Sequence, residues 1–187
     1  MRDELSIDEN KIVGINTGKF GSLYLDDEAF FLFRELKRII PNFFLIIITP
    51  SCHKKCKSQL ELMGFAEDDY FMKYAEAREV TQFMCAADFA LCLVIEKKIM
   101  FNLCVVRIAE YVANGLPVLY TKYSGEDSTE LLKGELGFEI NGETPIVENK
   151  FLERISLRYG IGESGKSFLQ NFRNRDNTLN AYRSIFN

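Results

Sequence analysis

Short apolar runs alternate with longer amphipathic stretches along most of the chain. The runs at 11–18, 42–49 and 89–95 are continuously apolar or rich in β-branched residues, a pattern typical of parallel strands that are buried on both faces. Shorter runs of the same kind predict three further strands, at 70–74, 116–121 and 136–140.

Apolar residues between these runs recur with the period of a helix. Segment 25–41 has acidic residues in its first turn and basic residues near its end, so its charges complement the helix dipole. Helices are predicted in the same way at 53–64, 77–88, 105–115 and 128–134, and through most of 145–187. This alternation predicts an α/β fold: a Rossmann-like open, mostly parallel sheet of about six strands, with helices on both faces and C-terminal helices.

The polar start of the chain contrasts with the rest. We expect residues 1–10 to form a partly disordered polar tail and residues 11–187 to form one domain, a length that suits a single hydrophobic core. The side chains expected inside this core include the aromatic stripe of the first helix and three thiols, namely Phe30, Phe31, Phe33, Cys85, Cys92 and Cys104.

Composition narrows the class of protein. A net charge of −4 argues against a nucleic-acid binder, which needs an excess of Lys and Arg. The charged N-terminus lacks the apolar segment of a signal peptide, and the apolar run 43–49 is too short to span a bilayer. We therefore expect a cytoplasmic protein with reduced thiols. Cys52, His53 and Cys56 fit no common zinc spacing, so no metal site is expected.

The segment GIGESGKS, residues 160–167, matches the P-loop pattern G-x-x-x-x-G-K-[ST]. A working P-loop follows a buried strand, but the preceding residues 148–159 alternate weakly and favour a helix. Only 20 residues follow Ser167, and they read as a helix rather than as the further strands that such a fold needs. We interpret the segment as a solvent-facing turn between two helices and keep a P-loop NTPase as a minor alternative.

Two other segments are better placed to bind phosphate, because ligands of open α/β sheets sit outside the carboxyl ends of the strands. The first is TGKFGSLY, residues 17–24, where Gly18 and Gly21 let the backbone approach a ligand and Lys19 could meet an anion. The second is the start of the helix at 105–115. Arg107 in its first turn opposes the helix dipole, which favours a nearby anion, and Glu110 lies one turn on, where it could bind the vicinal hydroxyls of a ribose.

These segments, taken together with others along the chain, resemble those of a known protein family. TGKFGSLY, AADFALCLV, RIAEYVANGLPV and SGEDSTELL, in this order and spacing, resemble the C-terminal lobe of two-lobed (GT-B) glycosyltransferases of the family-4 type, which build capsular and lipopolysaccharide glycans. AEYVANGLPV is the most specific of these pieces, and NTLNAYRSIF near the end is similar to the closing helix of the family. The resemblance covers about residues 11–187.

The resemblance implies a nucleotide-sugar site and a hexosyltransferase that moves a sugar from a nucleoside diphosphate to an acceptor glycan or a lipid-linked hydroxyl. It implies that Glu110 holds the ribose, that Arg107 and the N–H groups of Cys104, Val105 and Val106 face the diphosphate, and that the backbone at Tyr74 and Ala75 meets the base. The loop residues implied to face the diphosphate are Gly18, Lys19, Phe20, Gly21 and Ser22. It implies no metal and no cofactor beyond the donor.

The chain also departs from this family. Asn102 stands where many members have a glutamate near the donor sugar, so Asn102 and Arg107 are the candidate catalytic residues. We expect the acceptor-binding N-terminal lobe of this family to be absent from the chain. We therefore expect residues 11–187 by themselves to bind donor weakly without turning over. A nucleotide-recognising, non-catalytic lobe is the alternative. We also expect the complete enzyme to associate peripherally with the inner face of the membrane.

Overall fold

The computed structural model describes residues 1–102, 105–133, 135–140, 149–156 and 161–172, with a few single residues beyond. The described residues form an all-parallel sheet of six strands in the order β3-β2-β1-β4-β5-β6. The strands are β1 Ile12–Thr17, β2 Phe43–Ile48, β3 Tyr70–Lys73, β4 Phe89–Cys92, β5 Val118–Thr121 and β6 Gly137–Ile140. The expected Rossmann-like fold is thereby confirmed.

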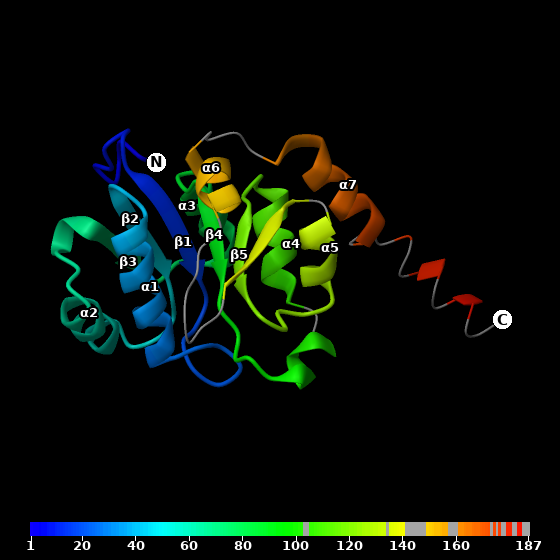
Figure 1. Ribbon diagram of the computed structural model, residues 1–187, viewed down its shortest axis with the longest axis horizontal. Helices are drawn as coiled ribbons and strands as arrows, with labels where there is room; N and C mark the ends of the chain where they lie inside the picture. The colour runs from blue at the N-terminus through cyan, green and yellow to red at the C-terminus, as the bar shows by residue number, and fades with distance from the viewer. Residues whose placement is uncertain are drawn as a thin grey trace.

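Helices cover both faces of the sheet (Figure 1). One apolar cluster joins the sheet to α1 Asp27–Ile39, α2 His53–Leu62 and α6 Asn149–Ser156. The other joins it to α3 Ala77–Met84, α4 Val106–Ala113, α5 Asp127–Lys133 and α7 Gly162–Phe172. Two short 3₁₀ helices, η1 Glu67–Asp69 and η2 Lys98–Asn102, lie in the connections. Since both faces are covered, all six residues of β2 are buried.

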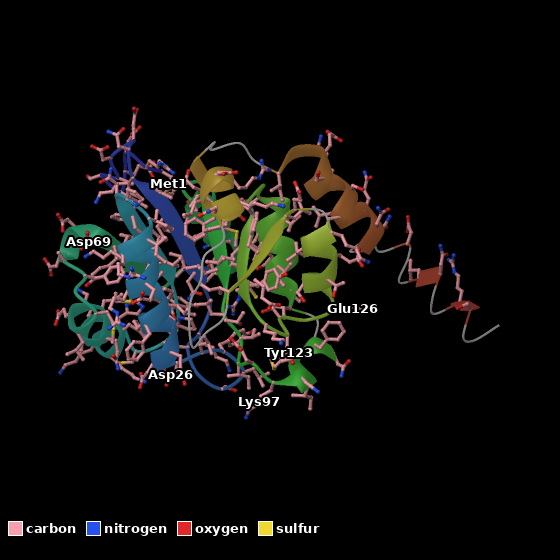
Figure 2. The ribbon with its side chains drawn as sticks, viewed as in Figure 1. Met1, Asp26, Asp69, Lys97, Tyr123 and Glu126 are labelled. Carbon is pink, nitrogen blue, oxygen red and sulfur yellow. The ribbon has the colours of Figure 1, made fainter. Side chains whose placement is uncertain are left out.

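The carboxyl ends of the strands meet at one edge of the sheet, the lower edge in Figure 1. Asp26, Lys97 and Tyr123 come from the loops that follow β1, β4 and β5, and they lie together along this edge (Figure 2). The chain leaves β1 toward β2 on one side and returns to β4 on the other side of β1. This reversal of strand order opens a crevice at the end of β1, where ligands of open α/β sheets bind.

The N-terminal residues pack onto the domain instead of forming the partly disordered tail that we expected. The Arg2 guanidinium pairs with Asp88 at 2.8 Å, and its Nε donates a hydrogen bond to the Ala86 carbonyl oxygen at 2.9 Å. Ile7 is buried in the core. The burial of Ile7 and the contacts of Arg2 with residues distant in the sequence hold this segment on the domain. The polar composition of residues 1–10 does not indicate these contacts.

Two core expectations are wrong. Phe31 is 45% exposed, because it points away from the face of α1 that buries Phe30 and Phe33, and its ring lies under the Arg34 guanidinium at 5.2 Å. Cys85 is exposed just after α3, whereas Cys92 is buried in β4. Cys104 lies outside the described residues.

The P-loop match also has a different structure from the expected turn. Residues 162–167 form the first turns of α7, and the described segment before them is the helix α6 rather than a strand. The Lys166 ammonium pairs with Glu163 at 2.6 Å on the exposed side of α7. Gly165 is buried, and a Cβ there would meet Ile161 of the preceding loop and Val112 of α4. This glycine serves helix packing, and a phosphate cradle is absent from residues 161–167.

Candidate functional site

A cleft of about 570 Å³ lies where β1, β2 and β3 end, between α3 and α4. Its walls include residues that the sequence predicted for the site and residues that it did not predict. The lining comprises Thr17, Gly18, Ile48, Thr49, Pro50, Tyr74, Ala75, Ala77, Val80, Thr81, Met84, Arg107, Glu110, Ala113 and Asn114. Arg107 and Glu110 are the only charged side chains among these described lining residues.

Gly18 and Arg107 meet at the entrance of the crevice. Gly18 has a φ of +105°, and its N–H donates to the Ile48 carbonyl oxygen at 2.8 Å, which turns the chain sharply at the end of β1. A Cβ on Gly18 would overlap the guanidinium of Arg107. Glycine is required here for two reasons, the left-handed backbone and the close approach of the cation.

Arg107 occupies the first turn of α4, where the helix dipole disfavours a cation. Its guanidinium stacks on the Tyr24 ring, with 4.2 Å between the guanidinium carbon and the ring centroid. No carboxylate among the described residues pairs with it within 4.0 Å. The Arg107 guanidinium is therefore half-buried, stacked on an aromatic ring and located at the positive end of a helix. This arrangement attracts an anion strongly.

Tyr111 fastens this part of α4 to the sheet. Its phenol oxygen accepts the Thr17 N–H at 3.1 Å and lies 2.9 Å from Thr17 Oγ1, while its hydroxyl donates to the Leu91 carbonyl oxygen at 3.1 Å. Complete burial raises the pKa of Tyr111 to about 12. One side chain thus joins the ends of β1 and β4 to the helix that carries Arg107 and Glu110.

Glu110 lies one helical turn after Arg107 and is exposed to the cleft. Among the described residues its carboxylate makes no ion pair, so both oxygens can accept hydrogen bonds from a ligand. A second hollow of about 380 Å³ adjoins the cleft and shares Arg107 and Glu110 with it.

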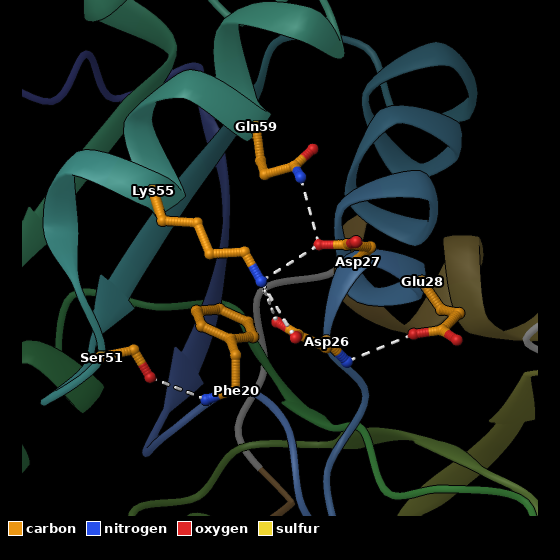
Figure 3. A network of polar contacts seen from close by, with 7 residues as sticks. All are labelled: Phe20, Asp26, Asp27, Glu28, Ser51, Lys55 and Gln59. Atoms are coloured by element: carbon orange, nitrogen blue, oxygen red, sulfur yellow. Dashed lines mark hydrogen bonds and ion pairs between the residues drawn. The ribbon is translucent and has the colours of Figure 1, made fainter.

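The loop between β1 and α1 is held from the α2 side (Figure 3). Lys55 lies 3.0 Å from both carboxylate oxygens of Asp26 and 3.4 Å from Asp27, and its hydrogen bond with Asp26 raises the pKa of the Lys55 ammonium. The Phe20 N–H donates to Ser51 Oγ at 3.0 Å. These contacts fix the loop that begins at Gly18.

The structure brings together only part of the predicted set. Gly18, Tyr74, Ala75, Arg107 and Glu110 line the cleft, and Val105 and Val106 line the second hollow. The others expected to face the diphosphate or the sugar lie outside both linings, namely Lys19, Phe20, Gly21, Ser22 and Asn102. Cys104 is outside the described residues.

Phe20 shows why one of these residues is absent from the lining. Its ring packs on Phe30 and Phe33, with centroids 5.0 and 6.2 Å away, and its N–H is already bonded to Ser51. The Gly21 N–H is likewise bonded, to the Leu25 carbonyl oxygen at 3.2 Å. Asn102 is exposed at the end of η2.

Sequence reasoning missed Tyr24 and Tyr111, which position Arg107 and the end of β1. It also missed the threonines that line the cleft, namely Thr17, Thr49 and Thr81. The position of Thr17 and Thr49 at the ends of two buried strands was the available signal. Tyr24 and Tyr111 belong to segments that carry the family resemblance, but their partners lie far away along the chain, so the local sequence does not indicate that they position Arg107 and β1.

No protein-family model and no curated protein matches the sequence. Solved structures do match the fold. WaaG, a glycosyltransferase involved in lipopolysaccharide biosynthesis, superposes with a TM-score of 0.64 at 18% identity over 91% of this chain and 45% of WaaG. The C-terminal domain of LpcC, a group 1 glycosyl transferase from Francisella tularensis, gives 0.62 at 15% identity over 92% of this chain and 91% of that domain. The chain has the fold of a GT-B glycosyltransferase lobe.

HepE from Anabaena, solved in complex with UDP-glucose, is similar to this lobe with a TM-score of 0.65 at 17% identity. The match covers 91% of this chain and 47% of HepE. The lobe therefore spans about half the length of WaaG and HepE, and most of the separate LpcC domain. None of the described helices is both long and apolar enough to cross a membrane.

Proposed function

We propose that the chain is the nucleotide-sugar donor-binding lobe of a hexosyltransferase, which transfers a sugar from a nucleoside diphosphate to an acceptor glycan or a lipid-linked hydroxyl. The observation that carries the proposal is the Arg107 guanidinium, held by Tyr24 directly over Gly18 at the first turn of α4. Backbone N–H groups at a helix start, together with an arginine, form a site for a diphosphate.

The surroundings of Arg107 fit the rest of a nucleotide. Glu110 offers two free carboxylate oxygens to the ribose hydroxyls, one helical turn from the diphosphate. Beyond it the cleft is lined by Pro50, Ala75 and Val80, and this apolar wall suits a flat base. The complex of the similar HepE with UDP-glucose supports this class of ligand.

Arg107 and the start of α4 would also promote the reaction. Transfer breaks the bond between the sugar and the diphosphate, and negative charge develops on the leaving phosphate oxygen. A preorganised cation and helix dipole stabilise this charge, so we expect no metal ion to be required. The acceptor and the group that activates it belong to the remainder of a two-lobed enzyme. The role of WaaG in lipopolysaccharide biosynthesis supports surface-polysaccharide assembly as the setting of the reaction. We place this reaction at the inner face of the membrane.

Titration calorimetry with UDP, TDP, GDP and ATP, each in EDTA and in Mg²⁺, tests the proposal. We expect one nucleoside diphosphate to bind without metal, and Arg107→Gln and Glu110→Gln to weaken it by about tenfold or more, because each removes charge-assisted hydrogen bonds. Lys166→Gln, on the exposed side of α7, is the control and should bind normally. Tight Mg-ATP binding that is lost in Lys166→Gln would instead favour a P-loop NTPase.

A non-catalytic, nucleotide-recognising lobe is the second candidate. The observation that favours it is Asn102, an amide exposed at the end of η2 and outside the lining of both hollows. Both candidates bind the nucleotide in the same way. Sugar transfer by the complete two-lobed protein separates them, since only the first candidate predicts it.

A further inference from the structure

The second hollow opens on the β4 side of Arg107, whereas the cleft opens on the side of β2 and β3. Its described lining consists of Leu23, Tyr24, Val94, Met100, Val105, Val106, Arg107 and Glu110. A nucleotide whose diphosphate contacts Arg107 and whose base lies in the cleft would direct its third part, the sugar, into this hollow. A volume of about 380 Å³ accommodates one hexose.

The surface of this hollow is apolar. Val94, Met100 and Val105 are buried and form its floor, while Leu23 and Val106 are exposed at its rim. The polar side-chain groups among its described residues are the Tyr24 hydroxyl and the charges of Arg107 and Glu110, which the diphosphate and the ribose would engage.

The backbone of the floor offers few further hydrogen bonds. The Val94 N–H donates to Thr121 Oγ1 at 2.9 Å, and the Thr121 hydroxyl donates back to the Val94 carbonyl oxygen at 2.7 Å. The Met100 N–H is bonded to the Lys97 carbonyl oxygen at 2.8 Å. A sugar hydroxyl that lies against this floor loses water and finds few partners among the described residues, whereas a methyl group gains apolar contacts.

Resting on the proposed function, we propose that the donor sugar carries a methyl group on the face that enters this hollow. The chemical class is a 6-deoxyhexose, in which a methyl group replaces a hydroxymethyl group. A fully hydroxylated hexose is disfavoured, and so is an N-acetylhexosamine, whose amide would bring further polar atoms into the hollow. The preference follows from the asymmetry of the site, which has charge on the side of the diphosphate and apolar side chains on the side of the sugar.

Calorimetry with matched donors tests this specificity. UDP, TDP and GDP are titrated first, and the tightest of them sets the series: its glucose, 6-deoxyglucose and N-acetylglucosamine esters. We expect the 6-deoxyglucose ester to bind about tenfold more tightly than the glucose ester, the effect of one methyl group in an apolar pocket. The N-acetylglucosamine ester should not share this preference, because its amide adds polar atoms.

Leu23→Asn tests the hollow itself, because this exposed rim residue can be exchanged without disturbing the core. The ratio of the two dissociation constants should fall toward one in Leu23→Asn and stay near ten in Leu62→Asn, a control at an exposed leucine of α2. Binding of a nucleoside diphosphate with equal or tighter affinity for the glucose ester would overturn this inference alone. Absence of any nucleoside diphosphate binding would overturn the proposed function with it.

Discussion

Arg107 and Gly18 depend on each other, although 89 positions separate them in the sequence. The guanidinium lies against the bare Cα of Gly18 on one side and the Tyr24 ring on another. Both neighbours belong to the loop after β1, so the position of the cation is set by that loop as much as by α4. The Arg107 charge can contact a ligand in the cleft only while this packing keeps the guanidinium in place.

Gly18→Ala tests this dependence at the residue scale. The new methyl group would displace the guanidinium and strain a left-handed backbone, so we expect affinity for the nucleoside diphosphate to fall at least tenfold and stability to fall by about 1–2 kcal/mol. Gly64→Ala is the matched control, because Gly64 has a φ of +80° with no atom within 4 Å of its added Cβ. Urea unfolding should show a loss of stability in both variants, and calorimetry should show a loss of affinity in Gly18→Ala only.

At the scale of elements, the site depends on how the short helix α4 sits on the sheet. The Tyr111 hydroxyl group holds the helix to the ends of β1 and β4, and Gly115, with a φ of +77°, ends the helix just beyond. The surface network of Lys55 with Asp26 and Asp27 is exposed, so it orients the β1–α1 loop and adds little stability. The buried phenol is the stronger attachment.

Tyr111→Phe should lower the free energy of unfolding at pH 7 by about 1–3 kcal/mol, because it leaves the buried Thr17 N–H without its partner. Urea unfolding measures this difference. Tyr123→Phe is the control, since the Tyr123 hydroxyl has no hydrogen-bond partner among the described residues. Equal effects of the two substitutions would contradict the role assigned to Tyr111.

The stability difference between the native chain and Tyr111→Phe should depend on pH. The pKa of Tyr111 is raised from 10 to about 12 in the folded state, so the unfolded chain ionises first as the pH rises. The stability that depends on this group is complete below pH 10 and is lost as the pH rises toward 12. We therefore expect the stability difference between the native chain and Tyr111→Phe to shrink across that interval. A constant difference would show that the phenol does not titrate in this way.

For the whole molecule, two apolar clusters on opposite faces of one sheet make a single domain with its site at an open edge. The chain matches about half the length of WaaG and of HepE, and the cleft is where we propose that a donor binds. Reaction with an acceptor needs a second surface that closes over the donor and excludes water.

We therefore expect the chain by itself to bind donor without transferring sugar. A coupled assay measures the rate at which nucleoside diphosphate is released from the donor, with and without candidate acceptors. This rate should be no higher than that of the Arg107→Gln variant. Donor binding measured on the same preparation shows that the protein is folded. Transfer at an ordinary enzymatic rate would contradict this expectation.

The sequence predicted the order and the type of the elements well, because each buried strand is a nearly continuous apolar run and each helix has an amphipathic period. The boundaries moved by a few residues, as in α3, which ends at Met84 rather than at 88. The failures at residues 1–10 and at the P-loop match share a cause, because Arg2 pairs with Asp88 and Gly165 packs toward Val112, and both partners are distant in the chain. Phe31 and Cys85 were expected in the core because they are apolar, but both are exposed.

The sequence by itself determined the α/β fold, and it predicted a ligand at the carboxyl ends of the strands and binding roles for Gly18, Arg107 and Glu110, which stay predictions. Hydrophobic period and helix dipole act over a few residues, so they can be read along the chain. Only the tertiary structure decided that Tyr24 and Tyr111 hold this site, that GIGESGKS includes the start of a packed helix, and that an apolar hollow lies beside Arg107. Those features come from side chains brought together across the sheet, and their spacing in the sequence does not encode them.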